Sequence, residues 1–257
     1  MRSLIVTVAG LSSRFNEGYA EPVLKCLHTD GDERKTLLWQ ILEKAGPCDR
    51  LIVVGGYKFA DLQEFCRHLP DNIRERLTLV FNPKYDTAGS GYSLAVGIQA
   101  LPEADGEVIF AEGDLYYTAA SFDELADSPA SAYSVNHELL FARKAVAAYL
   151  DADGRIKYLY DTSHNLLSIP EPFCAVFNSA QVWKFHKTDL LRRIVAEMEP
   201  MRLEGTNLEI IQSYFDALAP GEYRMVDFPV WLNCNTRVDY DLMVRLITNQ
   251  NSRKTLC

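Results

Sequence analysis

The sequence lacks the features that mark two common classes of protein. It has no basic run, since 26 Lys and Arg stand against 35 Asp and Glu for a net charge of -9. A nucleic-acid backbone is bound by clustered positive charge, so we expect no nucleic-acid partner. No apolar stretch approaches the roughly 20 residues that cross a bilayer, so we expect no membrane span.

Cysteine motifs and a cleavable leader are missing as well. The six cysteines are scattered, without a C-x-x-C pair or a histidine at metal-ligand spacing. The first residues are apolar only as far as Leu11, and no small-residue cleavage site follows. The sequence therefore predicts reduced thiols, Cys257 included, and a first strand in a cytoplasmic protein.

The chain has the composition of an ordinary globular α/β protein, with 257 residues, 48% hydrophobic and 24% charged. Helix and strand patterns alternate up to about residue 127. Repeated β-α-β crossovers predict a Rossmann-like, mostly parallel sheet with helices on both faces. Strands are expected at 4–8, 51–54, 77–81 and 107–111, and helices at 37–45, 59–69 and 92–101.

The pattern changes after residue 127, which predicts a mixed α+β second half. Asp151-Ala152-Asp153-Gly154 is typical of a hairpin turn between two strands. No linker or repeat divides the chain, so we expect one domain over residues 1–257. Strands are expected at 130–135, 145–150 and 155–160, and helices at 190–199, 208–217 and 239–248.

The most informative segment is V-A-G-L-S-S-R-F-N-E-G-Y-A-E-P-V-L-K at residues 8–25. It follows the unalternating, β-branched run of a buried parallel strand. Ligands bind at the carboxyl ends of such strands, where small residues let backbone N–H groups approach phosphate oxygens. We expect a triphosphate to contact Ala9, Gly10, Leu11, Ser12 and Ser13, with positive charge supplied by Arg14 and Lys25.

This loop matches neither of the common phosphate-binding motifs. G-x-G-x-x-G would need a glycine at Ser12, and the sequence has no G-K-[ST]. A generic strand-to-helix turn with a solvated Arg14 is the alternative interpretation.

Two later segments carry candidate metal ligands. V-I-F-A-E-G-D-L-Y at 108–116 is a buried strand that ends near Asp114, on the same edge of the sheet as the first loop. Mg²⁺ takes one or two carboxylates together with phosphate oxygens and water, so Asp114 is the expected ligand. An ordinary turn aspartate is the alternative. W-L-N-C-N-T-R-V-D at 231–239 offers Asn235 as a neutral ligand, and Thr236 and Asp239 suit the start of a helix.

Together these segments resemble the nucleotidyltransferases that activate phosphorylated sugars and alcohols, including bacterial choline-phosphate cytidylyltransferases. V-A-G-L-S-S-R-F is similar to the family's A-A-G-x-G-S-R-L, with Ser12 in place of the second glycine. Lys25-Cys26-Leu27 falls where the family has K-P-L, and G-G-Y-K at 55–58 resembles V-x-G-Y-K-x-E.

The resemblance continues along the chain, with departures in two segments. N-P-K-Y-D-T-A-G-S-G-Y-S-L at 82–94 resembles N-P-x-Y…N-N-x-x-S-L, but Gly89 and Ser90 replace the paired Asn. The segment at 231–239 resembles W-x-[DE]-I-D-T-x-x-D, with Asn233 and Asn235 in place of acidic residues.

The resemblance implies a GT-A-like fold, with an NTP-binding half at 1–127 and an acceptor-binding half at 128–257. It implies transfer of a nucleoside monophosphate from an NTP to a phosphate or phosphonate, with Mg²⁺ as cofactor. Arg14 would bind the β- and γ-phosphates, and Lys25 the α-phosphate. Ser90 and Ser93 would contact the nucleotide, and Asp114 would hold Mg²⁺ together with Asn235. The amide at Asn235 lowers the negative charge of the site by one, which predicts weaker metal binding.

The resemblance favours CTP and a small phosphorylated alcohol or phosphonate as acceptor. A sugar-1-phosphate nucleotidyltransferase and a catalytically silent nucleotide-binding module are the alternatives, and assembly of several copies stays open. Core packing explains the aromatic residues of the second half as well as stacking on a cationic head group does. The residues concerned are Tyr158, Tyr160, Phe173, Trp183 and Trp231.

Overall fold

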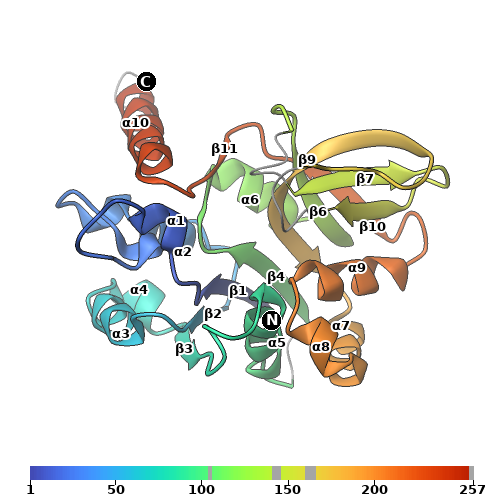
Figure 1. The fold of residues 1–257 in the computed structure, drawn as a ribbon, viewed down its shortest axis with the longest axis horizontal. Helices are drawn as coiled ribbons and strands as arrows, with labels where there is room; N and C mark the ends of the chain where they lie inside the picture. Colours follow the sequence, from blue (N-terminus) through green and yellow to red (C-terminus); the bar gives the residue numbers. More distant parts are fainter. Residues whose placement is uncertain (104–105, 141–145, 160–165, 255–257) are drawn as a thin grey trace.

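The computed structural model describes residues 1–103, 106–140, 146–159 and 166–254, and its main feature is one twisted, nine-stranded sheet (Figure 1). The strands are β1 (Arg2–Val8), β2 (Arg50–Gly55), β3 (Leu77–Phe81), β4 (Glu107–Glu112), β6 (Ser131–Asn136), β7 (Ala147–Asp151), β8 (Ile156–Leu159), β9 (Phe173–Phe185) and β10 (Tyr223–Asp227). A two-stranded sheet pairs β5 (Leu115–Tyr117) with β11 (Trp231–Asn233).

The sheet is parallel in its first half and mixed in its second. Its strand order is β10-β6-β9-β4-β1-β2-β3, with β7 and β8 added beside β9. Strands β3, β2, β1 and β4 run parallel to one another, whereas β9 is antiparallel to β4, β6 and β7. The predicted fold class is confirmed, and the sheet runs without a break from the first half of the chain into the second.

Helices cover both faces of the sheet. They are α1 (Ser13–Asn16), α2 (Leu37–Glu43), α3 (Phe59–Arg67), α4 (Asp71–Arg74), α5 (Ser90–Gln99), α6 (Ala119–Ala126), α7 (Thr188–Glu197), α8 (Pro200–Leu203), α9 (Leu208–Asp216) and α10 (Arg237–Lys254). One core lies between the sheet and α2, α3, α6 and α10, and the other between the sheet and α5, α7 and α9. Alternate residues of β1 enter opposite cores: Leu4 and Val6 one, Ile5 the other. No helix of the described residues is both long and apolar enough to span a membrane.

Most of the expected elements form close to their predicted bounds. The strand at Leu77–Phe81 is as predicted, and Thr36 caps α2 by accepting a hydrogen bond from the N–H of Trp39. The hairpin between β7 and β8 forms, with Gly154 at φ 74° in the turn. The strand ends predicted at residues 145 and 160 lie outside the described residues, as does Cys257. The other five cysteines are free thiols.

Strand β9 is the main element that the sequence patterns do not predict. Its centre is polar in sequence but buried, with Ser179 and Lys184 at most 1% exposed. The Lys184 ammonium donates to the carbonyl oxygen of Ala126 at 2.8 Å and lies 3.0 Å from the Glu107 carboxylate. Hydrogen bonds and an ion pair therefore offset the cost of burying Lys184. The residue pattern of β9 does not indicate that this polar side chain is buried.

Candidate functional site

The carboxyl ends of β1 and β4 meet at one edge of the sheet. Thr7 pairs in register with Glu112, so the loop after Val8 and the turn at Gly113 lie side by side. A side chain at Gly113 would place its Cβ 2.3 Å from the Val8 side chain, so only glycine permits this approach. The turn therefore brings Asp114 next to the first loop.

The first loop has a left-handed turn at Ser12. Its φ of 57° is a conformation that glycine adopts easily, and glycine is the residue that the resembling family has there. The Ser12 hydroxyl accepts a hydrogen bond of 3.1 Å from the N–H of Lys25. This bond closes the loop and places Lys25 at the edge of the pocket.

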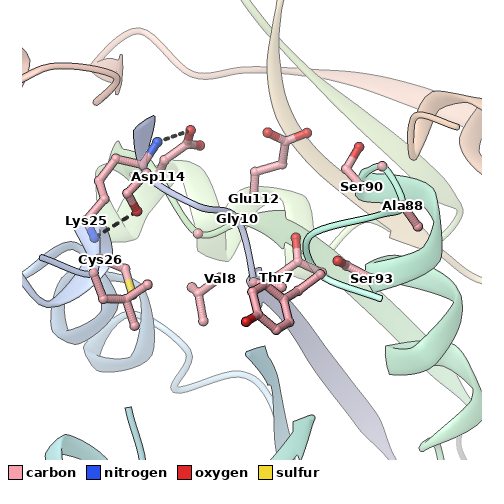
Figure 2. Close-up of a pocket in the computed structure, with 16 residues that line it drawn as sticks. Thr7, Val8, Gly10, Lys25, Cys26, Ala88, Ser90, Ser93, Glu112 and Asp114 are labelled. Carbon is pink, nitrogen blue, oxygen red and sulfur yellow. Dashed lines mark hydrogen bonds and ion pairs between the residues drawn. The ribbon is translucent and has the colours of Figure 1, made fainter. Parts of the chain in front are cut away.

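An ion pair between Lys25 and Asp114 lies at one side of the pocket (Figure 2). The Lys25 ammonium lies 2.8 Å from Oδ2 of Asp114, and each side chain is 18% exposed. The other carboxylate oxygen of Asp114, Oδ1, is buried and has no hydrogen-bond partner among the described residues. Because buried polar atoms are normally paired, this oxygen is suited to a ligand that the structure does not contain.

Glu112 is a second carboxylate of the pocket. Figure 2 shows it between the Lys25–Asp114 pair and Ser90. Oε1 of Glu112 accepts a hydrogen bond of 2.8 Å from the side-chain amide of Asn207. Burial raises the pKa of Glu112 to about 7, and the Asp114 carboxylate adds to the rise, while Asn207 and Lys25 act in the opposite direction.

Asn207 reaches the pocket from a segment that lies far away in sequence. The N–H of Gly89 donates to the carbonyl oxygen of Glu204 at 2.7 Å, and that of Gly91 to Gly205 at 3.0 Å. A Cβ at Gly89 would lie 2.3 Å from the Gly205 carbonyl oxygen. Glycine at position 89 therefore lets residues 203–206 pack on the start of α5. We did not identify Asn207 from the sequence, because it belongs to no motif.

The pocket, of about 220 Å³, collects seven of the eleven site residues expected from the sequence. These seven are Ala9, Gly10, Ser12, Lys25, Ser90, Ser93 and Asp114. The Ser90 hydroxyl accepts a hydrogen bond from the backbone N–H of Asn207, and the Ser93 hydroxyl accepts one from the side-chain amide of Asn82. The pocket lining also includes Thr7, Val8, Leu24, Cys26, Tyr85, Ala88, Gly89, Glu112 and Gly113.

Four expected residues, all within the described ranges, do not line this pocket: Leu11, Ser13, Arg14 and Asn235. Arg14 is exposed on α1. Asn235 is 5% exposed, and its amide donates to Oδ1 of Asn233 at 2.7 Å. It lies beyond the end of β11, directly after Cys234, whose N–H donates to the Asp114 carbonyl oxygen at 2.8 Å. The backbone at Asn235 therefore lies close to Asp114, but the side-chain amide of Asn235 is hydrogen-bonded to Asn233.

The start of α10 has the expected capping contacts. The Asp239 carboxylate accepts hydrogen bonds from the N–H groups of Asn235 and Thr236. The Thr236 hydroxyl in turn accepts a bond of 3.3 Å from the N–H of Asp239. Asp239 is therefore occupied at the helix start, as expected from the sequence.

Among the residues that the structure describes, Asp114 is the carboxylate with a buried oxygen that has no partner, which suits it to a divalent cation. The unpartnered Oδ1 provides one oxygen ligand, and Glu112 adds nearby negative charge. The described residues contain no cluster of three or more His, Cys, Asp or Glu side chains arranged for a metal. Mg²⁺ needs no such cluster, because substrate phosphates and water complete its coordination.

The aromatic residues considered for a cationic head group are mostly core residues. Trp183 is 0% exposed and stacks on Phe110, and its indole N–H donates to the Tyr158 hydroxyl at 2.9 Å. Trp231 is buried, and its indole N–H donates to the carbonyl oxygen of Ala180. Packing and hydrogen bonds occupy these three residues, which favours the core-packing alternative. Phe173 is exposed away from the pocket lining, and Tyr160 lies outside the described residues.

A family model matches residues 21–247, which is most of the chain. The chain belongs to the family described as "Domain of unknown function (DUF6564)". The matched residues of this DUF6564 protein include Lys25, Glu112 and Asp114, whereas Ser12 and Arg14 precede them. No curated protein is significantly similar to it in sequence.

Solved structures similar to this DUF6564 chain include several enzymes of nucleotide transfer. An inositol-1-phosphate CTP transferase from T. maritima has a TM-score of 0.66 at 17% identity, and the match covers 95% of each chain. A putative glucose-1-phosphate thymidylyltransferase from Bacillus anthracis has a TM-score of 0.71 at 14% identity, covering 96% of this chain and 95% of that one. A UDP-glucose pyrophosphorylase has a TM-score of 0.67 at 12% identity, covering 97% and 99%. At these identities the likeness shows the fold alone.

Proposed function

We propose that this protein is a nucleotidyltransferase that transfers a nucleoside monophosphate from an NTP to a phosphorylated acceptor and releases pyrophosphate. The Lys25–Asp114 pair carries this proposal, because it puts a cation and a partly free carboxylate beside a small-residue loop at the sheet edge. Ligands bind at that edge in open α/β sheets. The fold shared with enzymes of this class supports the same conclusion.

The reaction requires positioning and charge stabilisation rather than a covalent enzyme intermediate. An acceptor phosphate oxygen forms a bond to the α-phosphorus while the bond to the bridging oxygen breaks, and pyrophosphate leaves. The acceptor oxygen is already ionised at neutral pH, so no general base is needed. Lys25 would stabilise the growing charge on the α-phosphate, and the exposed Arg14 would bind the β- and γ-phosphates.

We propose Mg²⁺ as the cofactor, held by Asp114 and by the phosphates of the bound nucleotide. When bound, it would neutralise charge on the nucleotide and acceptor. Asn235 stays a candidate second ligand. Its amide nitrogen donates to Asn233, so it would coordinate through its carbonyl oxygen Oδ1, which that bond does not use.

CTP and a small phosphorylated alcohol or phosphonate are the substrates that we propose. The motif resemblance to choline-phosphate cytidylyltransferases supports CTP, as does the fold likeness to an inositol-1-phosphate CTP transferase. The other two similar structures favour the second candidate, a sugar-1-phosphate nucleotidyltransferase. We further propose that residues 1–127 bind the nucleotide and residues 128–257 the acceptor.

Pyrophosphate release tests this function. Each NTP is supplied with Mg²⁺ and a panel of phosphocholine, phosphoethanolamine, aminoethylphosphonate, small alcohol phosphates, inositol-1-phosphate and sugar-1-phosphates. Turnover with CTP and a small acceptor supports the first candidate, and turnover only with sugar-1-phosphates supports the second. Binding of an NTP without turnover on any acceptor would instead identify a catalytically silent module.

The substitution Lys25→Ala tests whether Lys25 contributes to catalysis. We expect turnover to fall by about 10²- to 10³-fold, as for loss of one preorganised group that stabilises transition-state charge. Lys35→Ala removes the same charge from the surface near an exposed 3-10 turn and should leave turnover unchanged.

A further inference from the structure

Arg237, the first residue of α10, contacts the loop of residues 9–24 from outside. Its guanidinium carbon lies 4.6 Å from the centre of the Phe15 ring and 4.5 Å from that of Tyr19. Its Nη1 lies 2.6 Å from Nδ1 and 2.7 Å from Nε2 of His28, a ring that packs edge-on against Phe15 with centroids 5.3 Å apart. One side chain of the C-terminal segment therefore contacts both the loop and the residue His28 that follows it.

His28 is suited to accept this hydrogen bond. Burial lowers its pKa, and the neighbouring positive charge of Arg237 lowers it further, so the neutral ring with a free nitrogen is favoured. On its other side the ring packs against Tyr240 of α10 at 4.6 Å. His28 follows directly after the 3-10 turn Lys25–Leu27, so a tether at His28 acts on the backbone that presents Lys25.

The loop itself has a shape that needs outside support. Its helix α1 has four residues and no side-chain cap at Ser12, and a helix of one turn is not stable alone. Asn16 exchanges two hydrogen bonds of 2.9 Å with the backbone of Val23, which closes the loop but does not attach it to the rest of the molecule. Tyr19, at the outer end, is 54% exposed.

We propose that Arg237 is a positioning residue that holds this loop in the shape that receives the triphosphate, an inference that rests on the proposed function. Figure 1 shows α10 standing next to the N-terminal segment that carries α1. A guanidinium suits this position because it stacks on aromatic faces and hydrogen-bonds in its plane at the same time, whereas an ammonium does not. Arg237 is outside the described pocket lining, so it acts through the loop.

The full-length chain with Arg237→Ala tests the proposal by two measurements. Hydrogen exchange of the amides in residues 10–24 reports on the loop without any substrate, and we expect it to accelerate about tenfold. The KM for the NTP should rise by about tenfold while kcat changes less than about twofold, because cation–π contacts and a hydrogen bond are lost from the loop and none from the reacting atoms. Arg237→Lys, which keeps the charge but not the planar group, should fall between Arg237→Ala and the wild type.

Arg245→Ala is the matched control, since Arg245 is an exposed arginine on the same helix. It should leave both exchange and KM unchanged. Unchanged exchange in Arg237→Ala, or a loss confined to kcat, would overturn the proposal. If Arg237→Ala fails to fold, the same two measurements on Arg237→Lys decide. A wild-type chain that binds no NTP overturns the proposed function instead, and the exchange of residues 10–24 still decides whether Arg237 holds the loop.

Discussion

Asp114 combines two properties that are rarely found on one carboxylate at a protein surface. One oxygen is paired with Lys25 at 2.8 Å, and the other is buried without a partner among the described residues. The first bond fixes the side chain, and the second oxygen is left for a ligand. The carboxylate is therefore held in place before any cation binds.

The substitution Asp114→Asn tests whether Asp114 binds the cation. The amide keeps the shape of the side chain but removes the charge that attracts a divalent cation. We expect turnover to fall by about 10²- to 10³-fold and binding of Mn²⁺, measured by its electron paramagnetic resonance in the presence of NTP, to weaken about tenfold or more. Asp123→Asn, on the exposed face of α6, should change neither. Equal Mn²⁺ affinity in Asp114→Asn and wild type would place the metal elsewhere.

Lys44 should make the stability of the protein depend on pH. Its ammonium lies 4.6 Å from the centre of the Tyr116 ring and donates to the carbonyl oxygen and side chain of Gln40. Burial lowers the pKa of Lys44 from 10.5 to about 7. Between these values the unfolded chain binds more protons than the folded one, so the free energy of unfolding rises with pH, by at most about 1.4 kcal/mol per pH unit.

The measurement is urea unfolding at several pH values from 7 to 10. Lys44→Met keeps most of the packed stem and removes the titrating group, so the free energy of unfolding of this variant should rise less with pH than that of the wild type. Lys35→Met, at a more exposed lysine, should retain the full rise. Parallel curves for wild type and Lys44→Met would show that Lys44 is charged in the folded state.

The residues of the candidate site differ in how far the sequence could predict them. Lys25 and Asp114 were predictable, because each follows a recognisable strand or motif at the same sheet edge. From the sequence, Glu112 could be recognised only as the end of a strand. Its hydrogen bond comes from Asn207, which is 95 residues away. Such a contact follows from how two loops pack, and no local pattern encodes it.

At the scale of elements, residues 203–206 pack on the start of α5, where Gly89 and Ser90 line the pocket. Gly89→Ala would place a methyl group 2.3 Å from the Gly205 carbonyl oxygen. We expect a loss of about 1–3 kcal/mol of stability from this overpacking, measured by urea unfolding, and a weaker Asn207–Glu112 contact. Gly46→Ala, with no atom within 4 Å of the added Cβ, is the control and should cost less. Equal effects of the two substitutions would mean that this packing is loose.

The elements that sequence patterns predict well are those with one dominant period. The first β-α-β unit is predicted because β1 and β2 each contain an apolar, β-branched run and Thr36 caps α2 between them. Strand β9 is not predicted from the sequence, because four of its polar residues are buried: Asn178, Ser179, Gln181 and Lys184. Gln181 also adopts a left-handed φ of 60°, so it interrupts the regular alternation of the strand. Tertiary partners determine this strand more than its own residue pattern does.

At the scale of the whole molecule, one sheet joins the two proposed halves. Strand β4 of the first half pairs with β9 of the second, and Phe110 stacks on Trp183 across this boundary with ring centroids 5.4 Å apart. Each of the two cores contains residues from both halves, such as Leu4 and Val226 in one and Ile5 and Phe185 in the other. Neither half therefore has a core of its own.

This shared core predicts that the protein unfolds in a single transition. Phe110→Ala should lower stability by about 3–5 kcal/mol, and far-ultraviolet circular dichroism and tryptophan fluorescence should shift to the same lower urea midpoint, because the loss at the boundary affects both halves at once. Phe173→Ala, at a residue that is 52% exposed, should stay within about 0.5 kcal/mol of wild type. Two separate midpoints in Phe110→Ala would mean that the halves fold independently, and the chain would then consist of two domains in spite of its continuous sheet.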